Sequence, residues 1–333
     1  MAINIHKLSG LPTISLGTTI MTPPTSPKIG AYIQPLVINN IAKVLSLNKI
    51  LLLDKGGLSA KDYAERKQDY LENFIGDLNE YKIIENVDFA RDMIKSIQHE
   101  INEGYIKEKE IDVFTCECGK LFFPKNKEVF LNKVTGKVAI KTVNGYSCKL
   151  CNTVAKTKHI NSLLLDIASY DIESLDLVVF PNRFNNYVAS TSNRLKTREI
   201  LITKMTVSDL VVNGYNVNND FMWAMLPFVV NEKTDIDLHY FVTSNKTLYH
   251  FIYAALISRV FGKKDYVKGL IVTPYYSFRN SIDIDFWRLS QNIVSKINGS
   301  RDIIDITNTD LDLKKYNNSV KQIEMFFNSF AKH

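Results

Sequence analysis

The chain of 333 residues has no apolar segment long enough to cross a membrane. A membrane-spanning helix needs about 18 or more consecutive apolar residues, and no such run occurs. The first ten residues, MAINIHKLSG, also lack a basic segment followed by an apolar core, so we expect no secretory signal. With 45% hydrophobic and 23% charged residues, the composition predicts a globular protein without membrane contact, and we expect it in the cytoplasm.

The sequence also lacks the short glycine-rich motifs that hold phosphate groups. Neither G-x-G-x-x-G nor the P-loop pattern is present. The formal net charge of +6 is spread along the chain, without a dense block of Lys and Arg. That charge is compatible with nucleic-acid contact, but a solvated surface is the favoured interpretation.

A βαβ unit is nevertheless predicted over residues 18–57. The pattern indicates a strand ending at Met21, a proline-rich loop, a helix over about 30–47 and a second strand over 49–54. The N-terminus of such a helix favours an anion such as a nucleotide phosphate. Asp54 follows four apolar residues and so falls at the carboxyl end of a buried strand, where parallel sheets bind ligands. It is a candidate for holding a substrate ammonium group, or else caps the strand.

All four cysteines of the chain lie within one segment. They form two closely spaced pairs, Cys116 with Cys118 and Cys148 with Cys151. In a chain without a secretory signal, this clustering favours a structural zinc site with four thiolate ligands, which leaves no position for a catalytic water. Two disulfides or four buried thiols are the alternatives. Strand-like residues between the pairs, with a Thr-Gly turn at 135–136, predict a small ribbon.

Further elements follow from hydrophobic periodicity. Helices are predicted over Leu58–Asn79, with Ser59 as N-cap, and over Asp88–Glu103, ended by Gly104. A strand is expected over Leu175–Phe180. The basic stretch after it carries Arg183, Arg194, Lys196 and Arg198 around Phe184 and Tyr187. Such a mixture suits single-stranded nucleic acid, although a solvated loop is the more ordinary interpretation.

The loop Pro23–Ala31 resembles the start of the catalytic domain of class I aminoacyl-tRNA synthetases, in particular the methionyl type. In that family a strand, a proline-containing loop and a His-Ile-Gly-His tetrad open the helix that cradles ATP. This chain keeps Ile29 and Gly30 but has Lys28 and Ala31 at the two histidine positions. The resemblance implies ATP contacts from Pro24 and Gly30, a substrate contact from Met21, and a catalytic phosphate contact from Lys28, unless Lys28 is only a solvated loop residue.

The second half of the chain carries the closest local similarity. Residues 219–227, NDFMWAMLP, resemble the methionyl-type segment Val-Trp-Phe-Asp-Ala-Pro, which implies a substrate contact from Trp223. His250 has the offset of the family's pocket histidine, although a core or surface role is also open. Asn245 stands where the family has its ribose-contacting Asp, and Thr243 where it has a Gly.

A strand over Gly269–Pro274 leads to YSFRNS, where the family has its Lys-Met-Ser-Lys-Ser loop. In that loop the resemblance implies a catalytic cation at Arg279 and a nucleotide contact at Ser281. A cysteine knuckle in a connective insertion is typical of the methionyl branch.

The fold class implied is α/β, with a Rossmann-like parallel sheet split by a zinc-knuckle insertion and followed by a short helical C-terminal segment. The expected catalytic domain comprises residues 1–57 and 199–285, the insertion residues 58–198, and the last segment residues 286–333. Zinc is the implied structural metal, and ATP with Mg²⁺ the implied nucleotide.

Three functional readings remain open at this point. The chain is a ligase that activates an amino acid with ATP and transfers it to a small molecule, a carrier protein or a tRNA. Alternatively, it is an ordinary tRNA-charging enzyme with unusual motifs, or a pseudo-enzyme that serves as a binding module. An unrelated nucleotide-binding fold is a fourth possibility.

Overall fold

The structure is a computed structural model. It describes residues 15–17, 48–53, 55, 58–72, 81–115, 117, 121–122, 129–130, 139–142, 145–148, 151–173, 175–180, 182–203, 208, 210–234, 238–245 and 247–273. The predicted helix over 30–47 and the predicted helical segment after 285 lie outside these residues. None of the helices in the described part of the chain has the length and apolar character needed to cross a lipid bilayer.

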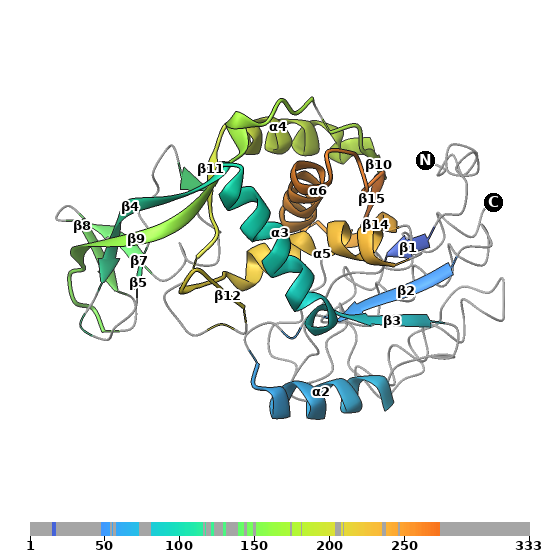
Figure 1. The fold of residues 1–333 in the computed structure, drawn as a ribbon, viewed down its shortest axis with the longest axis horizontal. Helices are drawn as coiled ribbons and strands as arrows, with labels where there is room; N and C mark the ends of the chain where they lie inside the picture. Colours follow the sequence, from blue (N-terminus) through green and yellow to red (C-terminus); the bar gives the residue numbers. More distant parts are fainter. Residues whose placement is uncertain are drawn as a thin grey trace, which may run out of the picture.

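A six-stranded parallel sheet forms one side of the molecule (Figure 1). Its strands, in spatial order, are β10 (Val178–Phe180), β15 (Gly269–Thr273), β14 (Leu238–Ser244), β1 (Ser15–Gly17), β2 (Asn48–Leu53) and β3 (Tyr81–Glu85). Every neighbouring pair is parallel. The predicted α/β class with a Rossmann-like parallel sheet is therefore confirmed, while the zinc-knuckle insertion stays a prediction.

The strand β2 shows why this sheet forms. Its residues Ile50, Leu51, Leu52 and Leu53 are all at most 1% exposed, so both faces of the strand are covered. A continuous apolar run is what a central parallel strand requires, because helices pack on both of its faces. The strand predicted over 49–54 is confirmed at 48–53.

Helix α2 (Ala60–Glu72) begins where the sequence predicts. The Ser59 hydroxyl accepts a hydrogen bond from the backbone N–H of Asp62 at 3.0 Å and donates to its carboxylate at 2.7 Å. These bonds satisfy one of the open N–H groups of the first turn. Tyr63 and Tyr70 are buried and lie nearly two turns apart on the inner face of the helix.

The 3₁₀ turn η3 (Asn86–Phe89) and helix α3 (Ala90–Asn102) lead from the main sheet into a second sheet. The helix ends as predicted at Gly104, whose φ of 79° lies in the left-handed region. The N–H of Tyr105 bonds to the carbonyl of Glu100 and that of Gly104 to the carbonyl of Ile101, both at 3.0 Å. This is the Schellman pattern, and it sends the chain directly into the next strand.

The second sheet has five strands and lies at the opposite end of the molecule (Figure 1). Its long central hairpin joins β4 (Ile106–Thr115) to β9 (Lys156–Asp166) through ten antiparallel residue pairs. The shorter strands β5 (Leu121–Phe122), β11 (Glu199–Leu201) and β6 (Val129–Phe130) complete it. A separate hairpin is formed by β7 (Ala139–Thr142) and β8 (Gly145–Cys148). The predicted ribbon turn at 135–136 lies outside the described residues.

Two further short elements follow β9. They are the 3₁₀ turns η5 (Ile167–Ser169) and η6 (Asn182–Phe184). Helix α4 (Asn185–Lys196) comes next, and a small hairpin of β12 (Val211–Val212) and β13 (Tyr215–Asn216) precedes the second half. The loop interpretation of the basic stretch is thus wrong, because Val188, Thr191, Ser192 and Leu195 recur at helical spacing and are buried.

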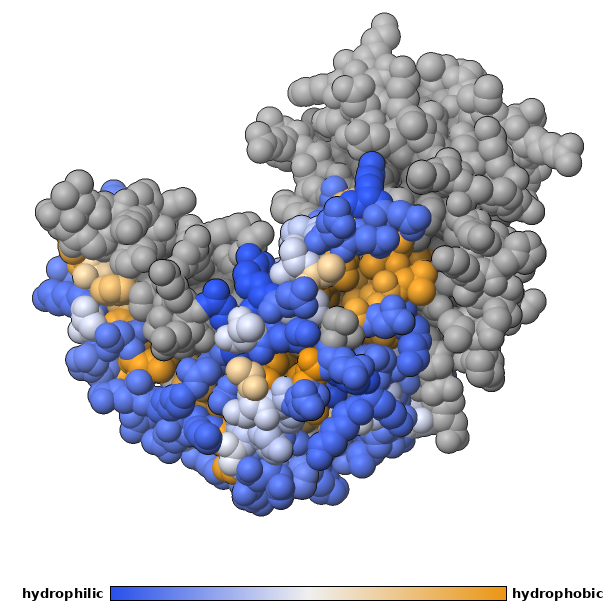
Figure 2. Space-filling model, turned by 90° about the horizontal axis from the view of Figure 1, so that it is seen from above, coloured by the Kyte–Doolittle hydropathy of each residue, from blue (hydrophilic) through white to orange (hydrophobic). Residues whose placement is uncertain are grey.

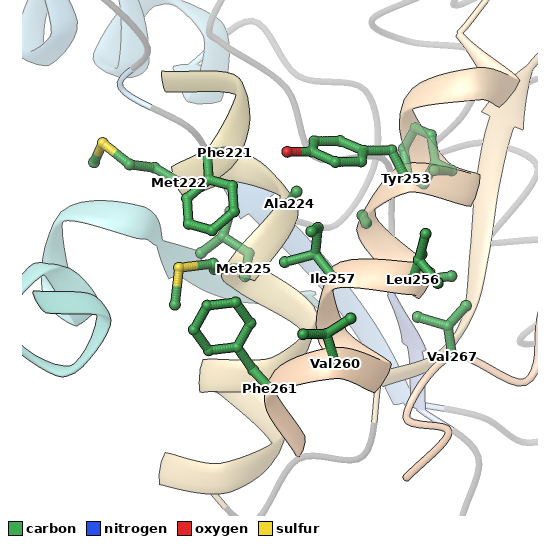
Figure 3. Close-up of a cluster of buried hydrophobic side chains, with 14 of the residues drawn as sticks. Phe221, Met222, Ala224, Met225, Tyr253, Leu256, Ile257, Val260, Phe261 and Val267 are labelled. Carbon is green, nitrogen blue, oxygen red and sulfur yellow. The ribbon is translucent and has the colours of Figure 1, made fainter. Parts of the chain in front are cut away.

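Helices α5 (Asn219–Lys233) and α6 (Leu248–Gly262) pack together at the centre of the core. Figure 3 shows Phe221, Ala224 and Met225 of α5 together with Tyr253, Ile257, Val260 and Phe261 of α6 in one cluster, while Met222 points away from α6. Helix α6 is buried along almost its whole length, which explains its uniformly apolar sequence.

Close packing determines the residue at the end of α6. Gly262 is the last helical residue, and Lys263 after it takes the left-handed conformation with φ 54°. A Cβ at position 262 would lie 1.9 Å from the ring of Tyr266. Glycine is needed here for close packing rather than for its backbone freedom.

How the chain divides into domains stays a prediction, and the hydrogen bonding of three strands bears on it. Strands β3 and β10 belong to the main sheet, although both fall within residues 58–198. Strand β11, expected to re-enter the nucleotide fold, instead pairs antiparallel with β9. Ile200 of β11 pairs with Leu165, and Leu201 pairs with Leu164, so the apolar end of β9 is the strand that β11 joins.

A buried polar contact fixes α3 against the segment after β9. The Glu100 carboxylate is only 3% exposed and accepts a hydrogen bond from the hydroxyl of Tyr170. The ring of Tyr170 stacks on that of Tyr105 with centroids 4.2 Å apart. Burial and the neighbouring carboxylate raise the pKa of Tyr170 well above its ordinary value, so the phenol remains a donor at neutral pH.

We therefore expect Tyr170→Phe to lower the free energy of unfolding by about 1–3 kcal/mol, because the buried Glu100 carboxylate loses a donor. Urea denaturation followed by circular dichroism measures the effect. Tyr187→Phe serves as the control, because Tyr187 is exposed. Equal stability of Tyr170→Phe and the unsubstituted protein would show that this contact contributes nothing.

Candidate functional site

The main sheet changes its direction of winding between β1 and β14. From β1 the chain moves outward through β2 and β3 on one side, and from β14 through β15 on the other. The carboxyl ends of the two central strands lie side by side, since Gly17 pairs in register with Phe241. In open α/β sheets, ligands bind outside the carboxyl ends of the strands at this kind of switch point.

Strand β14 runs three residues beyond that pair and turns into α6. Thr243 is fully buried, and its hydroxyl lies 2.9 Å from that of Thr247, the N-cap residue of α6. Asn245, between the strand and the helix, is exposed. The connection therefore presents an amide side chain to solvent at the switch point, beside the N-terminus of a 15-residue helix.

The predicted substrate residues Trp223 and His250 lie close together. Trp223 belongs to the first turns of α5 and His250 to the first turn of α6, and their ring centroids are 6.1 Å apart in an edge-to-face arrangement. The Trp223 ring also meets Phe251 edge to face at 5.0 Å. Both Trp223 and His250 are half-buried, so the pair borders the surface. Two residues far apart in the sequence thus form one aromatic group next to the switch point.

One polar residue next to this aromatic group, Tyr253, was not singled out from the sequence. Figure 3 shows the hydroxyl of Tyr253, one turn after His250, pointing towards α5. Burial raises the pKa of Tyr253 well above its usual value, with smaller contributions from Tyr249 and Asp220. The side chain is therefore a neutral hydrogen-bonding group at the α5–α6 contact. Its spacing of three from His250 was the available signal, because it places both residues on neighbouring positions of one helix face.

Hydrogen bonds of the Asn86 and Glu85 side chains fix the carboxyl ends of β2 and β3. The buried side-chain oxygen of Asn86 accepts a hydrogen bond from the backbone N–H of Lys55 at 2.9 Å. Glu85 accepts hydrogen bonds from the hydroxyl of Tyr63, at 2.9 Å, and from the amino group of Lys67. Asp54 lies outside the described residues, but its neighbours Leu53 and Lys55 place this segment at the carboxyl edge of the sheet.

Other predicted site residues cannot be placed. Those outside the described part of the chain are Met21, Pro24, Lys28, Gly30, Arg279, Ser281, Cys116 and Cys118. Among the residues that the structure describes, no group of three or more His, Cys, Asp or Glu side chains could hold a metal ion. The proposed ligands Cys116 and Cys118 were not part of that set, so the zinc prediction stays untested.

The described neighbours of two of the cysteines lie at one end of the second sheet. Thr115, which precedes Cys116 in the sequence, is the last residue of β4 and pairs with Lys156, the first residue of β9. Thr115 also pairs with Leu121 of β5. Cys151 lies five residues before Lys156, with its sulfur 3.0 Å from the hydroxyl of Thr153.

Comparison with solved structures defines the class of fold. The chain has the fold of a class I aminoacyl-tRNA synthetase, and methionyl-tRNA synthetases of Mycobacterium tuberculosis are among the similar structures. The structure bound by methionyl-adenylate aligns with a TM-score of 0.56 at 12% identity, over 85% of this chain and 63% of that one. A second complex with methionyl-adenylate gives 0.52 at 10% identity, over 79% and 57% of the two chains. The free state gives 0.54 at 11% identity, over 85% and 60%.

This chain thus spans less than two thirds of the length of those synthetases. No protein-family model matches the sequence, and no curated protein does. The likeness therefore establishes the fold. The substrates and chemistry of this chain have to be argued from its own residues.

The Asn86–Lys55 contact gives a direct test of how the edge of the sheet is held. We expect Asn86→Ala to lower the free energy of unfolding by about 1–3 kcal/mol, because a buried hydrogen bond is lost. Protection of the Lys55 amide from hydrogen exchange should fall in the same variant. Ser59→Ala, which removes the exposed N-cap of α2, is the control, and it should leave the Lys55 amide protected. Unchanged protection in Asn86→Ala would contradict this role.

Proposed function

We propose that the protein is an adenylate-forming ligase related to methionyl-tRNA synthetase, which activates an amino acid with ATP and transfers it to a non-standard acceptor. The observation that carries the proposal is the Trp223–His250 pair beside the β1–β14 switch point. A nucleotide at the strand ends and an amino-acid side chain against the aromatic group would then be neighbours.

The similar structures support the choice of substrates. Two of them are complexes of methionyl-tRNA synthetase with methionyl-adenylate, a compound made from an amino acid and ATP. The same class of reaction here would join the amino-acid carboxylate to the α-phosphorus of ATP and release pyrophosphate. The acceptor's nucleophile would then attack the acyl carbon, with AMP as the leaving group. Such an enzyme would work in the cytoplasm, where ATP and amino acids are available.

Each predicted site residue has a role in this scheme. Lys28 and Arg279 would offset the negative charge that develops on the phosphates, with Mg²⁺ accompanying ATP. Pro24, Gly30, Asn245 and Ser281 would contact the nucleotide. Met21, Asp54, Trp223 and His250 would contact the amino acid, with Asp54 facing its ammonium group.

The departures from the family pattern are the reason for proposing a different acceptor. Lys28, Ala31 and Asn245 replace the two histidines and the ribose-contacting aspartate of the resembling family. Each lost transition-state contact is typically worth about 2–4 kcal/mol, so the reaction would be slow unless new groups replace these contacts. The same losses make a binding module without catalysis the principal alternative.

We further propose that Cys116, Cys118, Cys148 and Cys151 bind a structural zinc ion. The support is the spacing of the two cysteine pairs and the pairing of Thr115 with Lys156, which lie one residue before Cys116 and five residues after Cys151 in the sequence. Four thiolates suit Zn²⁺, and the ion would join the segment after β4 to the segment before β9.

Exchange of radiolabelled pyrophosphate into ATP, screened over the standard amino acids, tests the activity. We expect exchange with at least one amino acid and a loss of about tenfold or more in Trp223→Ala and in His250→Ala, because the amino-acid contact weakens. His159→Ala is the matched control, since His159 is exposed on the second sheet. Absence of exchange, combined with absence of ATP binding by calorimetry, would leave only the binding-module alternative.

Acylation assays then identify the acceptor. With the activated amino acid, total tRNA should be a poorer acceptor than a carrier protein or a small amine. Efficient charging of one tRNA species would instead establish an ordinary synthetase and overturn the proposed change of acceptor.

Metal content tests the zinc proposal. The purified protein should contain about one zinc ion per chain, and the double variant Cys148→Ser/Cys151→Ser should lose it, because two thiolates cannot hold the ion tightly. Inductively coupled plasma mass spectrometry provides the measurement. A full complement of zinc in the double variant, or disulfides in the unsubstituted protein, would contradict the assignment.

A further inference from the structure

Helix α4 and the 3₁₀ turn before it form an acid-free basic surface. Residues 182–198 contain three arginines and one lysine and no aspartate or glutamate. The same segment contributes four asparagines, at positions 182, 185, 186 and 193. We propose that the exposed face of α4 binds single-stranded nucleic acid. The proposal does not depend on the ligase activity.

The helix is divided cleanly into a buried and an exposed face. Val188, Thr191, Ser192 and Leu195 are buried, and α4 packs on α6. The opposite face carries Arg183, Tyr187, Ser190, Arg194 and Thr197, at spacings of three and four residues. All five are exposed. Residues at these spacings form a stripe along one side of a helix.

The two arginines of this stripe are not engaged by acidic partners. No ion pair to Arg183 or Arg194 is found among the described residues, although ion pairs occur elsewhere in the same set. Arg183 lies over the ring of Phe184, 5.0 Å from its centroid, which steadies the guanidinium while its edge stays open to solvent. With a rise of about 1.5 Å per residue, Arg183 and Arg194 lie roughly 16 Å apart, far enough to contact separate phosphates.

Lysine 196 is excluded from the proposed surface. Its amino group bonds to the carbonyl of Ile172, between the exposed acidic residues Asp171 and Glu173. Negative charge at this end of the helix would repel a phosphate backbone. The proposed contact therefore runs from Arg183 to Arg194 and stops short of the last turn.

Tyr187 is what favours nucleic acid over an acidic protein as the partner. Its ring is 41% exposed at the middle of the stripe, between the two arginines. A tyrosine surrounded by cationic and amide groups provides a stacking surface for an unpaired base, while arginines hold the phosphates on either side. Seen from above, where α4 is the uppermost helix of Figure 1, the coloured surface is mostly hydrophilic, with apolar patches between the hydrophilic residues (Figure 2).

Helix α4 packs on α6, the helix that also carries His250. The proposed surface is the exposed side of α4, whereas Trp223 and His250 belong to α5 and α6. Nucleic acid on this surface would therefore contact a different element from the Trp223–His250 pair.

Fluorescence anisotropy with a labelled RNA of mixed sequence and about 20 nucleotides tests the proposal, titrated at several salt concentrations. The double variant Arg183→Gln/Arg194→Gln should bind roughly tenfold more weakly at low salt. Its slope of log K against log salt should be shallower by about 1.4, since each phosphate contact on a single strand contributes about 0.7. Tyr187→Ala should lose about 5- to 150-fold with little change in slope, and Tyr187→Phe should restore binding.

The matched control is Arg91→Gln/Lys95→Gln, which removes the same charge from two exposed positions of α3. All variants should keep the thermal unfolding temperature of the unsubstituted protein, because the replaced side chains are exposed. Equal losses in the α3 and α4 double variants would show a non-specific charge effect and overturn the proposal. So would unchanged binding in Tyr187→Ala, or tight binding only to an acidic peptide. Parallel titrations with single-stranded DNA of the same sequence and with duplex RNA show which kind of nucleic acid the surface binds.

Discussion

The structure depends on the placement of one short strand between two others that are distant in sequence. Strand β1 has only three residues, yet it pairs in parallel with β2 on one side and with β14 on the other. Ser15 and Leu238, one of its residue pairs, are separated by more than 200 positions. Such a pairing is costly in loop-closure entropy, and burial of β2 and β14 in the common core offsets that cost. Without β1, strand β2 would not be joined to β14, and the sheet would have no switch point.

Features set by local chemistry could be predicted from the sequence. The buried strand β2 follows from its apolar run, the start of α2 from the Ser59 cap, and the end of α3 from Gly104. The contact of Trp223 with His250 could be anticipated only through the resemblance to a known family. No periodicity relates a residue on α5 to one on α6.

Features set by long-range packing could not be read in the same way. Helix α4 looks like a basic loop in the sequence, because its buried face uses Thr191 and Ser192 in place of large apolar residues. Strand β11 is only three residues long, and its antiparallel pairing with β9 determines which sheet it joins. At Gly262 the decisive neighbour is the ring of Tyr266, which a rule based on helix-ending glycines does not include.

A frame of class I synthetase type with altered signature residues suggests how chemistry can change while a fold persists. The sheet order and the α5–α6 core depend on apolar packing, which tolerates sequence change to the level of 12% identity. Under the proposed function the polar site residues would carry the chemistry, and Lys28, Thr243 and Asn245 are positions where the sequence departs from the pattern of the resembling family.

A crystal structure with a non-hydrolysable aminoacyl-adenylate analogue would test the central claim most directly. The analogue should lie across the carboxyl ends of β1 and β14, with its adenosine near Gly17 and Asn245 and its aminoacyl side chain against Trp223 and His250. Density for the analogue elsewhere on the molecule, with the ends of β1 and β14 vacant, would contradict the assignment of the switch point as the active site.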